Sequence, residues 1–294
     1  MVAIRLDAAY CAPLVPRRDP QGHKGTFGFV LCVAGCLDYV GAALMCGTAA
    51  VRGGAGMVAL AVPRSIQPIV AGRVPETITI GLPEIAEGRI DAEASLAAII
   101  ERGPDVLVVG PGLMETGENA RLIEGLLANS GRPIVIDAAA VNMLASAPRW
   151  HELPSGNSCV LTPHPGEFAR LTGRPVAAHD EERLARAREA ARQFGQVVIL
   201  KGARTVVADA DRVAVATFAN PLLATAGSGD VLAGLVGALI GQGAAPFDAA
   251  CLGAYLHGRA GERLSGRFGD AGALATEIAN EIPAARHELV AHLS

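Results

Sequence analysis

A glycine turn that leads directly into an apolar segment is the feature of this sequence that most limits how the chain can fold. Residues 225–229 read Thr-Ala-Gly-Ser-Gly, Asp230 follows, and residues 231–240 are apolar. Small residues let the backbone bend sharply and approach a ligand closely. We interpret the apolar run as a buried helix, whose free N–H groups and positive dipole end would face out of the turn. The stretch therefore predicts an anion site suited to phosphate.

Asp230 is an unexpected residue at such a site, because a carboxylate repels a bound phosphate unless it takes part in the chemistry. Spacing alone leaves two interpretations open. The carboxylate either caps the helix that follows, or it acts as a catalytic group beside the phosphate.

Length and composition favour one large, well-packed domain. The chain has 294 residues, of which 51% are hydrophobic and 18% charged, and no linker or repeat divides it. We expect residues 1–294 to form one α/β domain, with residues 1–22 irregular. The net charge of −4 gives no reason to expect nucleic acid or an anionic membrane as a partner. Apolar segments such as 39–51 are too short to span a membrane.

The cysteines indicate a reducing compartment. None of the six belongs to a Cys-x-x-Cys pair, and the N-terminal residues lack the pattern of a signal peptide. We therefore expect buried free thiols and a cytoplasmic protein. The cysteines are Cys11, Cys32, Cys36, Cys46, Cys159 and Cys251.

Apolar runs that alternate with helical patterns predict a parallel sheet covered on both faces. The expected strands are 27–34, 57–62, 105–109, 133–136, 159–161 and 197–200, followed by a hairpin of 205–208 and 213–218. The expected helices are 41–52, 117–129, 141–144, 167–172, 181–194, 231–242, 247–264, 271–280 and 284–292.

Polar or glycine-bearing turns follow four of these strands. Ligands of open α/β sheets bind beyond the carboxyl ends of the strands, so we expect these turns and the glycine turn to share one site. There is no Gly-x-x-x-x-Gly-Lys-Ser/Thr loop and no complete dinucleotide fingerprint, which disfavours an ordinary Rossmann nicotinamide enzyme. The four turns are Gly110-Pro111-Gly112, Asp137, Thr162-Pro163-His164-Pro165-Gly166-Glu167 and Lys201-Gly202-Ala203-Arg204-Thr205.

Together with three further motifs, these turns strongly resemble the ADP-dependent NAD(P)H-hydrate dehydratase family of the ribokinase-like superfamily. The resemblance runs from about residue 20 to 265 and implies a three-layer α/β/α fold with a central, mostly parallel sheet. Many bacterial members carry an N-terminal epimerase domain, and we expect a standalone form here. The further motifs are His23-Lys24-Gly25, Gly41-Ala42-Ala43 and Asn220-Pro221 followed by Ala224-Thr225-Ala226-Gly227-Ser228-Gly229-Asp230.

The resemblance also implies roles for individual residues. Asp230 would be the catalytic base, and Ala226, Gly227, Ser228 and Gly229 would form an anion hole for the transferred phosphoryl group. Ala42, Gly112, His164 and Asp230 would line the pocket for the hydrate. The adenine nucleotide would contact Gly229 and the segment Lys201, Gly202, Ala203, Arg204 and Thr205. Glu167 stands where related kinases carry an acid that organises Mg²⁺ and phosphate.

The implied reaction phosphorylates the ring hydroxyl of NADH or NADPH hydrate with ADP and then eliminates phosphate, which gives NAD(P)H and AMP. ADP and Mg²⁺ would be required, and relatives are often homotetramers. Two departures from the family pattern stand out. Ala139 replaces the second acid of an Asp-Ala-Asp sequence, which puts a metal or phosphate role there in doubt, whereas Ala226 and Ser228 are mild changes in the anion turn. An Asp at a helix N-terminus should be ionised at neutral pH.

Several alternatives stay open. Asp137 could equally be a helix cap. A turn residue at His164 and a solvated strand end at Lys201 are less favoured alternatives. His257 and the arginines of 183–192 are expected to be structural or superficial. The chain could instead be a kinase for a vitamin-precursor alcohol, or a nucleotide-binding protein without catalysis.

Overall fold

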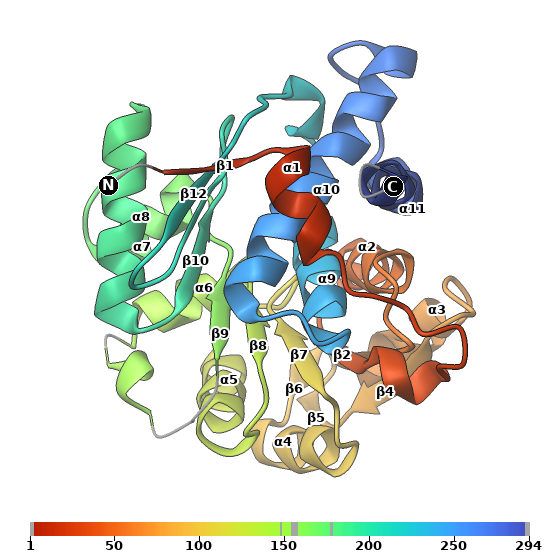
Figure 1. Ribbon diagram of the computed structural model, residues 1–294. Helices are drawn as coiled ribbons and strands as arrows, with labels where there is room; N and C mark the ends of the chain where they lie inside the picture. Colours follow the sequence, from red (N-terminus) through yellow and green to blue (C-terminus); the bar gives the residue numbers. More distant parts are fainter. Residues whose placement is uncertain (1–2, 148, 154–157, 177–178, 292–294) are drawn as a thin grey trace.

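The computed structural model describes residues 3–147, 149–153, 158–176 and 179–291. Within this part of the chain a ten-stranded sheet runs through the middle, with helices on both faces (Figure 1). Strand β11 is antiparallel to both of its neighbours, and the other neighbouring strands are parallel. The expected three-layer α/β/α architecture with a mostly parallel sheet is confirmed.

The order of the strands places a switch point next to the predicted site. The chain runs from β2 outward to β3 and β4, then returns to β7 on the other side of β2 and continues to β8, β9 and β10. Ligand crevices form where the strand order reverses in this way. In order across the sheet the strands are β1 (Ile4–Leu6), β12 (Val213–Ala216), β11 (Val206–Ala208), β10 (Val197–Leu200), β9 (Cys159–Leu161), β8 (Ile134–Ile136), β7 (Val106–Val109), β2 (Phe29–Val33), β3 (Met57–Pro63) and β4 (Ile78–Leu82). A separate hairpin pairs β5 (Glu84–Ala86) with β6 (Arg89–Ile90).

Each face of the sheet has its own hydrophobic core. Successive strand residues point to opposite faces, so Val30 and Cys32 of β2 join one core while Leu31 and Val33 join the other. The first core takes in α1 (Ala8–Cys11), α2 (Val40–Arg52), α3 (Gln67–Ala71), α9 (Ser228–Gly241), α10 (Pro246–Phe268) and α11 (Ala275–Ala291). The second takes in α4 (Ala92–Glu101), α5 (Gly117–Asn129), α6 (Ala139–Ala145), α7 (Pro165–Thr172) and α8 (Asp180–Phe194). Short 3₁₀ turns occupy Ala12–Leu14, Lys24–Phe27, Arg64–Ile66, Trp150–Glu152 and Pro221–Leu223.

Helix α9 lies deepest because it is apolar on all sides. Every residue from Val231 to Ile240 is buried. Gly234 lets α9 cross α2 closely, since a Cβ atom there would lie 2.1 Å from the carbonyl oxygen of Cys46. The predicted buried helix is thus confirmed, and its first turn opens at the carboxyl edge of the sheet.

The prediction that residues 1–22 are irregular is wrong for part of that segment. Residues Ile4–Leu6 form the edge strand β1, which pairs in parallel with β12. Asp7 then caps α1 by accepting a hydrogen bond from the backbone N–H of Tyr10 at 3.0 Å. A strand of three residues gives too short an alternation to be recognised, and its partner lies more than 200 residues away in the sequence.

The prediction of two separate C-terminal helices, 271–280 and 284–292, is also wrong. A single helix, α11, starts at Ala275 and continues through Pro283. Pro283 lies on the exposed side of α11, where the missing N–H costs one hydrogen bond without burying an unpaired carbonyl. The predicted hairpin before the glycine turn is confirmed as β11 and β12.

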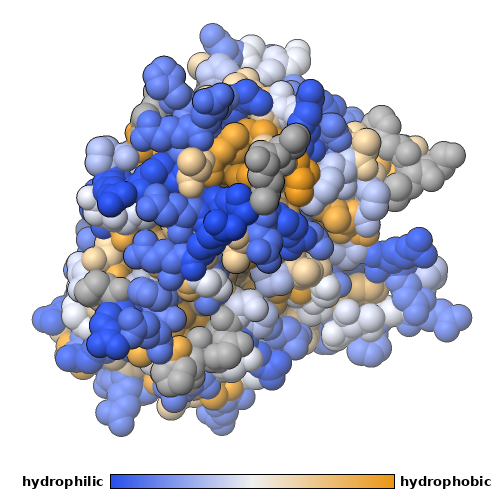
Figure 2. Space-filling model, turned by 60° about the vertical axis from the view of Figure 1, so that its left-hand side comes forward, coloured by the Kyte–Doolittle hydropathy of each residue, from blue (hydrophilic) through white to orange (hydrophobic). Residues whose placement is uncertain are grey.

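The surface of the molecule agrees with two internal cores. The face in Figure 2 is mainly hydrophilic, and hydrophobic residues show in limited areas of it. All six cysteines are buried free thiols. Among the described residues, no helix combines the length and the apolar character needed to cross a membrane.

Candidate active site

Backbone hydrogen bonds tie the strand-end turns into one edge. The N–H of Asp137 donates to the carbonyl of Val109 at 3.0 Å, and that of Lys201 donates to the carbonyl of Pro163 at 2.9 Å. The N–H of Gly35, after β2, donates to the carbonyl of Pro111 at 2.8 Å. The structure therefore brings together the turns after β7, β8, β9 and β10, as the sequence predicted, and adds the turn after β2 to the same edge.

Lys201 stands between two buried carboxylates at this edge. Its ammonium nitrogen lies 2.7 Å from Oδ1 of Asp137 and 3.9 Å from Oε2 of Glu167. The Asp137 side chain is 1% exposed and the Glu167 side chain 6%. Burial alone would lower the pKa of Lys201, but the two carboxylates outweigh it and leave that pKa raised. Lys201 is consequently a fixed cation, and the interpretation as a solvated strand end is wrong.

Asp137 is not a helix cap. Its Oδ1 accepts hydrogen bonds from Thr162 Oγ1 at 2.5 Å and from Lys201 Nζ at 2.7 Å, whereas the N-cap of α6 is Ala138, without a side-chain cap. Ala138 has φ 49°, and it is the single non-glycine residue with positive φ among the described residues. Strained backbone of this kind persists where the surroundings enforce it and concentrates at functional sites. Ala139 begins α6 and supplies no second carboxylate.

The first turn of α9 points its N–H groups at the same edge. Within the described chain, the N–H groups of Ala226, Gly227 and Gly229 donate to no protein acceptor, as expected for the open end of a helix. Gly227 has φ 87°, and a Cβ atom there would lie 2.2 Å from Sδ of Met45, so glycine is required. A Cβ atom on Gly229 would lie 3.1 Å from Lys201 Nζ. The helix end and the lysine thus face one small space, which suits a phosphate group.

Asp230 lies in the first turn of α9, but its carboxylate does not cap the helix, because the N-cap is Gly227 and no side chain makes a cap hydrogen bond. Burial, together with the nearby charges of Asp137 and Glu167, raises the pKa of Asp230 to about 7 against the opposing effect of Lys201. The expected ionisation at neutral pH is therefore incomplete, because desolvation favours the neutral carboxyl group. A carboxylate with this pKa is a stronger base than an exposed one.

His164 and Glu167 form a reciprocal cap on α7. Nδ1 of His164 accepts from the N–H groups of Gly166 and Glu167 at 3.0 and 3.3 Å, and Glu167 Oε2 accepts from the His164 N–H at 2.7 Å. The ring proton must then sit on Nε2, which lies 3.4 Å from Glu167 Oε1. His164 is therefore a turn residue, as one of the two interpretations held. Its ring also lines the cavity described next.

A cavity of about 570 Å³ opens beside the lysine and the glycine turn. Its walls are mostly apolar, and Lys201 and Gly229 lie at one side, an arrangement typical of a site for a flat ring joined to an anion. Of the predicted nucleotide residues, Lys201, Gly202, Ala203, Thr205 and Gly229 line the cavity. Arg204 does not; its guanidinium instead pairs with Asp180 at 2.5 Å.

Arg183 supports the nucleotide segment from below, which sequence reasoning missed. This residue of α8 is 7% exposed, and its Nη2 donates to the carbonyls of Leu200, Lys201 and Arg204 at 3.2 to 3.4 Å. A Cβ atom on Gly202 would lie 2.5 Å from the same nitrogen. Burial lowers the pKa of Arg183.

The sequence did contain a sign that Arg183 is buried. It lies on the same stripe of its helix as the buried residues Ala187, Ala190 and Ala191, which follow it by four, seven and eight positions.

His257 meets the anion turn from α10. The ring is 9% exposed, and its Nε2 lies 3.0 Å from Oγ of Ser228. Burial lowers the pKa of His257 to about 4, so the ring is neutral near pH 7. The next residue, Gly258, packs so closely on Phe218 that a Cβ atom there would lie 1.8 Å from the ring. Through this contact His257 supports the turn at the site, and it also lines the main cavity.

Two of the predicted hydrate residues, Ala42 and Gly112, lie against each other, whereas His164 and Asp230 lie nearer to Lys201. Gly112 has φ 66°, and a Cβ atom there would lie 2.6 Å from Cβ of Ala42 and 2.9 Å from the carbonyl oxygen of Tyr39. The backbone turn after β7 therefore touches the first turn of α2. Met45 of the same helix contacts Gly227, so α2 connects this part of the edge to the anion turn.

The carboxylates do not form a ready metal cage. No group of three or more His, Cys, Asp and Glu side chains among the described residues could hold a metal ion. The Lys201 ammonium already occupies the cation position at Asp137. Mg²⁺ is usually bound through one or two carboxylates, several waters and substrate phosphates. These residues therefore suit an ion that arrives with the nucleotide rather than one held by protein ligands alone.

Comparisons with known proteins agree with this geometry. A sequence model of the family described as NAD(P)H-hydrate dehydratase matches residues 30–284. The bifunctional NAD(P)H-hydrate repair enzyme of Moorella thermoacetica is 44% identical over 95% of this chain and 53% of its own length. The ADP-dependent (S)-NAD(P)H-hydrate dehydratase of Neisseria meningitidis is 38% identical over 92% of this chain and 87% of its own. This chain thus spans about half the length of the bifunctional relative and most of the other.

A solved structure extends the match to the fold. The ADP/ATP-dependent NAD(P)H-hydrate dehydratase from Bacillus subtilis, crystallised with ATP and Mg²⁺, aligns with a TM-score of 0.85 at 28% identity. The alignment covers 98% of this chain and 99% of that one. The fold implied by the resemblance is therefore confirmed, and the chain belongs to the NAD(P)H-hydrate dehydratase family.

Proposed function

We propose that the chain dehydrates the S epimer of NADH or NADPH hydrate to NAD(P)H at the expense of ADP, a carbon–oxygen lyase reaction that repairs damaged nicotinamide nucleotides. Family membership supports the reaction class. The observation that carries the mechanism is the half-buried Asp230, whose pKa is raised to about 7, next to Lys201 and the open N-terminal turn of α9.

The first step is phosphoryl transfer. The ring hydroxyl of the hydrate attacks the β-phosphorus of ADP, the bond from that phosphorus to the AMP oxygen breaks, and AMP leaves. Asp230 takes the hydroxyl proton as the new bond forms. Lys201 and the N–H groups of Gly227 and Gly229 neutralise the charge on the transferred group.

The second step is elimination. The phosphorylated carbon loses phosphate with the bonding electron pair, helped by the lone pair of the adjacent ring nitrogen. The neighbouring carbon then loses a proton, and the ring double bond of NAD(P)H is restored. Hydroxide would be a poor leaving group in the same position, which is why the reaction consumes ADP.

The residues divide between two substrates. The apolar cavity and the segment from Lys201 to Thr205 would bind the adenine nucleotide, with Arg183 holding that segment. Ala42, Gly112 and His164 would line the hydrate pocket. Mg²⁺ bound to the ADP phosphates would supply further charge neutralisation, with Glu167 reaching it indirectly through water.

Recovery of the absorbance of NADH tests the proposal. The purified chain is incubated with NADH hydrate, ADP and Mg²⁺, and AMP and phosphate are quantified in parallel. We expect equal amounts of NADH, AMP and phosphate. Turnover of a vitamin-precursor alcohol with ATP, without any turnover of the hydrate, would instead establish the kinase alternative.

A second measurement addresses the non-catalytic alternative. Asp230→Asn removes the base and keeps the shape of the site. A protein that only binds nucleotide would keep its role in this variant, whereas the proposed enzyme loses turnover.

Assembly and location complete the proposal. The family resemblance implies a homotetramer, and the free cysteines and the net charge of −4 favour a cytoplasmic protein that uses small-molecule substrates. Light scattering on the purified protein would give about four times the chain mass of 30.0 kDa if it is a tetramer.

A further inference from the structure

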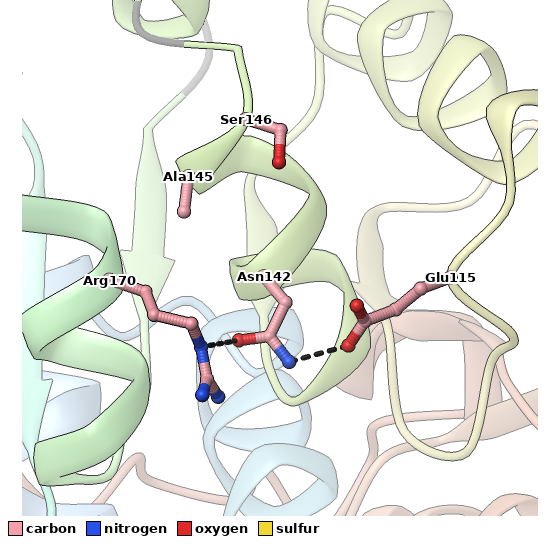
Figure 3. Close-up of a pocket in the computed structure, with 5 residues that line it drawn as sticks. All are labelled: Glu115, Asn142, Ala145, Ser146 and Arg170. Carbon is pink, nitrogen blue, oxygen red and sulfur yellow. Dashed lines mark hydrogen bonds between the residues drawn. The ribbon is translucent and has the colours of Figure 1, made fainter.

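A second pocket, of about 430 Å³, opens on the side of the sheet covered by α5, α6 and α7 (Figure 3). Its lining is small and mostly polar, and it shares no residue with the larger cavity. The lining residues are Glu115, Asn142, Ala145, Ser146 and Arg170.

A chain of hydrogen bonds joins three separate segments across this pocket. Nε of Arg170, on α7, donates to Oδ1 of Asn142, on α6, at 2.9 Å. Nδ2 of Asn142 donates to Oε1 of Glu115, in the turn after β7, at 2.6 Å. Both bonds are visible in Figure 3, where the guanidinium of Arg170 lies beside the amide of Asn142. The side chain of Arg170 is thereby oriented through its Nε atom.

The two terminal nitrogens of Arg170 are left available by this arrangement. Arg170 is exposed, and within the described residues neither Nη1 nor Nη2 makes a hydrogen bond or an ion pair, so both nitrogens face solvent. A guanidinium held at one nitrogen presents its other N–H groups as a fixed fork, which matches phosphate oxygens. Such a group is therefore suited to binding an anion.

Each segment of the pocket continues from a strand end of the proposed active site. Glu115 follows Gly112 by three residues, and Asn142 follows Asp137 by five. Arg170 lies three residues after Glu167 in α7, hence one turn further along the same side of that helix. The three segments that line the pocket therefore start from the same strand ends as the proposed active site, and the pocket shares no lining residue with the adenine-nucleotide cavity.

The proposed substrate requires a site of this kind. Only the hydrated nicotinamide ring reacts, yet the molecule also carries two riboses, two phosphates and an adenine. The larger cavity is assigned to ADP, so the adenylate half of the hydrate must lie elsewhere. It carries phosphate charge, and its ribose hydroxyls can donate to a carboxylate such as Glu115, which would otherwise repel the phosphates.

We propose that the pocket formed by Glu115, Asn142 and Arg170 binds the adenylate half of the hydrate, with the guanidinium of Arg170 contacting a phosphate oxygen. The inference rests on the proposed function and adds a second point of attachment for that substrate. The phosphate is either part of the pyrophosphate, present in both hydrates, or the 2′-phosphate that only NADPH hydrate carries.

Arg170→Met tests this with three substrates: NADH hydrate, NADPH hydrate and the hydrate of reduced nicotinamide mononucleotide, which lacks the adenylate half. A lost charge-assisted contact should raise KM for the dinucleotide hydrates about tenfold or more. We expect kcat and the KM for ADP to stay within about twofold, and the mononucleotide hydrate to react equally well with variant and wild type. Equal effects on the two dinucleotides identify the pyrophosphate, and a larger effect on NADPH hydrate identifies the 2′-phosphate.

Arg121→Met is the matched control, because Arg121 is an exposed arginine of the neighbouring α5 that, among the described residues, forms an ion pair with Glu118 alone. It should leave every KM unchanged. The subsite is overturned if Arg170→Met leaves both dinucleotide KM values unchanged, or if the mononucleotide hydrate suffers equally, since the residue would then act on the catalytic edge or on folding. Failure of the wild type to convert any hydrate would contradict the proposed function itself, which is a different result.

Discussion

The ammonium nitrogen of Lys201 lies 2.7 Å from Oδ1 of Asp137, and the pair closes the carboxyl edge of the sheet between β8 and β10. Thr162 donates a second hydrogen bond to the same carboxylate oxygen. Because Asp137 is 1% exposed, its charge depends on Lys201 for compensation. Removing one partner from a buried pair costs more than the pair itself contributes.

Lys201→Met should therefore destabilise the fold by about 3 kcal/mol, which is the lower end of the range for breaking a buried ion pair, since Lys201 is itself 20% exposed. Urea unfolding at pH 7 measures the change. Lys24→Met, at the chain's other lysine, which is exposed, should change the free energy of unfolding by less than about 0.5 kcal/mol. A similar loss in both variants would mean that the pair contributes nothing specific.

The pH dependence of turnover should follow Asp230. A base must be ionised to accept a proton, and its pKa is raised to about 7 by burial and by Asp137 and Glu167. We expect kcat/KM to be level above about pH 8, half-maximal near pH 7 and about tenfold lower at pH 6 than on the plateau. Lys201 lowers this pKa, so Lys201→Met should move the midpoint upward. A midpoint near pH 4 would show that Asp230 is not the group that titrates.

Arg183 should affect the nucleotide and not the hydrate. Its guanidinium holds three carbonyls of the segment that lines the adenine-nucleotide cavity. Arg183→Met should raise the KM for ADP about tenfold while the KM for the hydrate stays constant, because hydrogen bonds from a charged group are worth about 1.5–3 kcal/mol. Arg192→Met is the control, since Arg192 lies exposed on the same helix and donates to the carbonyl of Ala210. Equal effects on both substrates would point to general unfolding of the segment.

Patterns in the sequence predicted the sheet because its strands are continuous apolar runs, and they predicted α9 because an apolar helix after a glycine turn has few alternatives. They did not reveal β1, which is three residues long and gains stability only by pairing with the distant β12. The break expected near Pro283 also failed, because exposure of that residue cannot be seen in the local sequence. The local sequence of a segment does not show which other part of the folded chain the segment will contact.

The candidate site, like the fold, could be predicted only in part from the sequence. Motifs identified the turns, whereas the ionisation of Asp230 depends on Asp137 and Glu167, which reach it only in the folded chain. The helix dipole suggested an ionised carboxylate, but the cost of desolvation is larger and could not be judged without burial. Arg183 and His257 were set aside as structural because charge and position in a helix say little about side-chain contacts.

His257 should make the fold less stable in mild acid. Burial lowers its pKa to about 4 in the folded state, against about 6.5 in an unfolded chain. The unfolded state therefore binds a proton that the folded state does not, and stability is lost as the pH falls from about 6.5 towards 4. His257→Gln should show a smaller loss over this range while keeping a partner for Ser228. The test is the free energy of unfolding of both proteins, measured from pH 8 to pH 4. If the wild type and His257→Gln lost the same free energy over this range, the prediction would be wrong.

Asp230 should affect stability in the opposite direction. Its folded pKa of about 7 lies above the value of about 4 in an unfolded chain, so its contribution is fully present below pH 4 and is lost as the pH rises to 7. At pH 8 the ionised carboxylate is held near Asp137 and Glu167 at a cost in free energy. Asp230→Asn removes that charge, so the variant should melt at a higher temperature than the wild type at pH 8, with the difference shrinking towards pH 4. The same variant should lose about 10²–10⁴-fold in kcat. A gain in stability together with a loss of turnover would identify Asp230 as a residue kept for chemistry, whereas a less stable variant at pH 8 would place the carboxylate in a structural role.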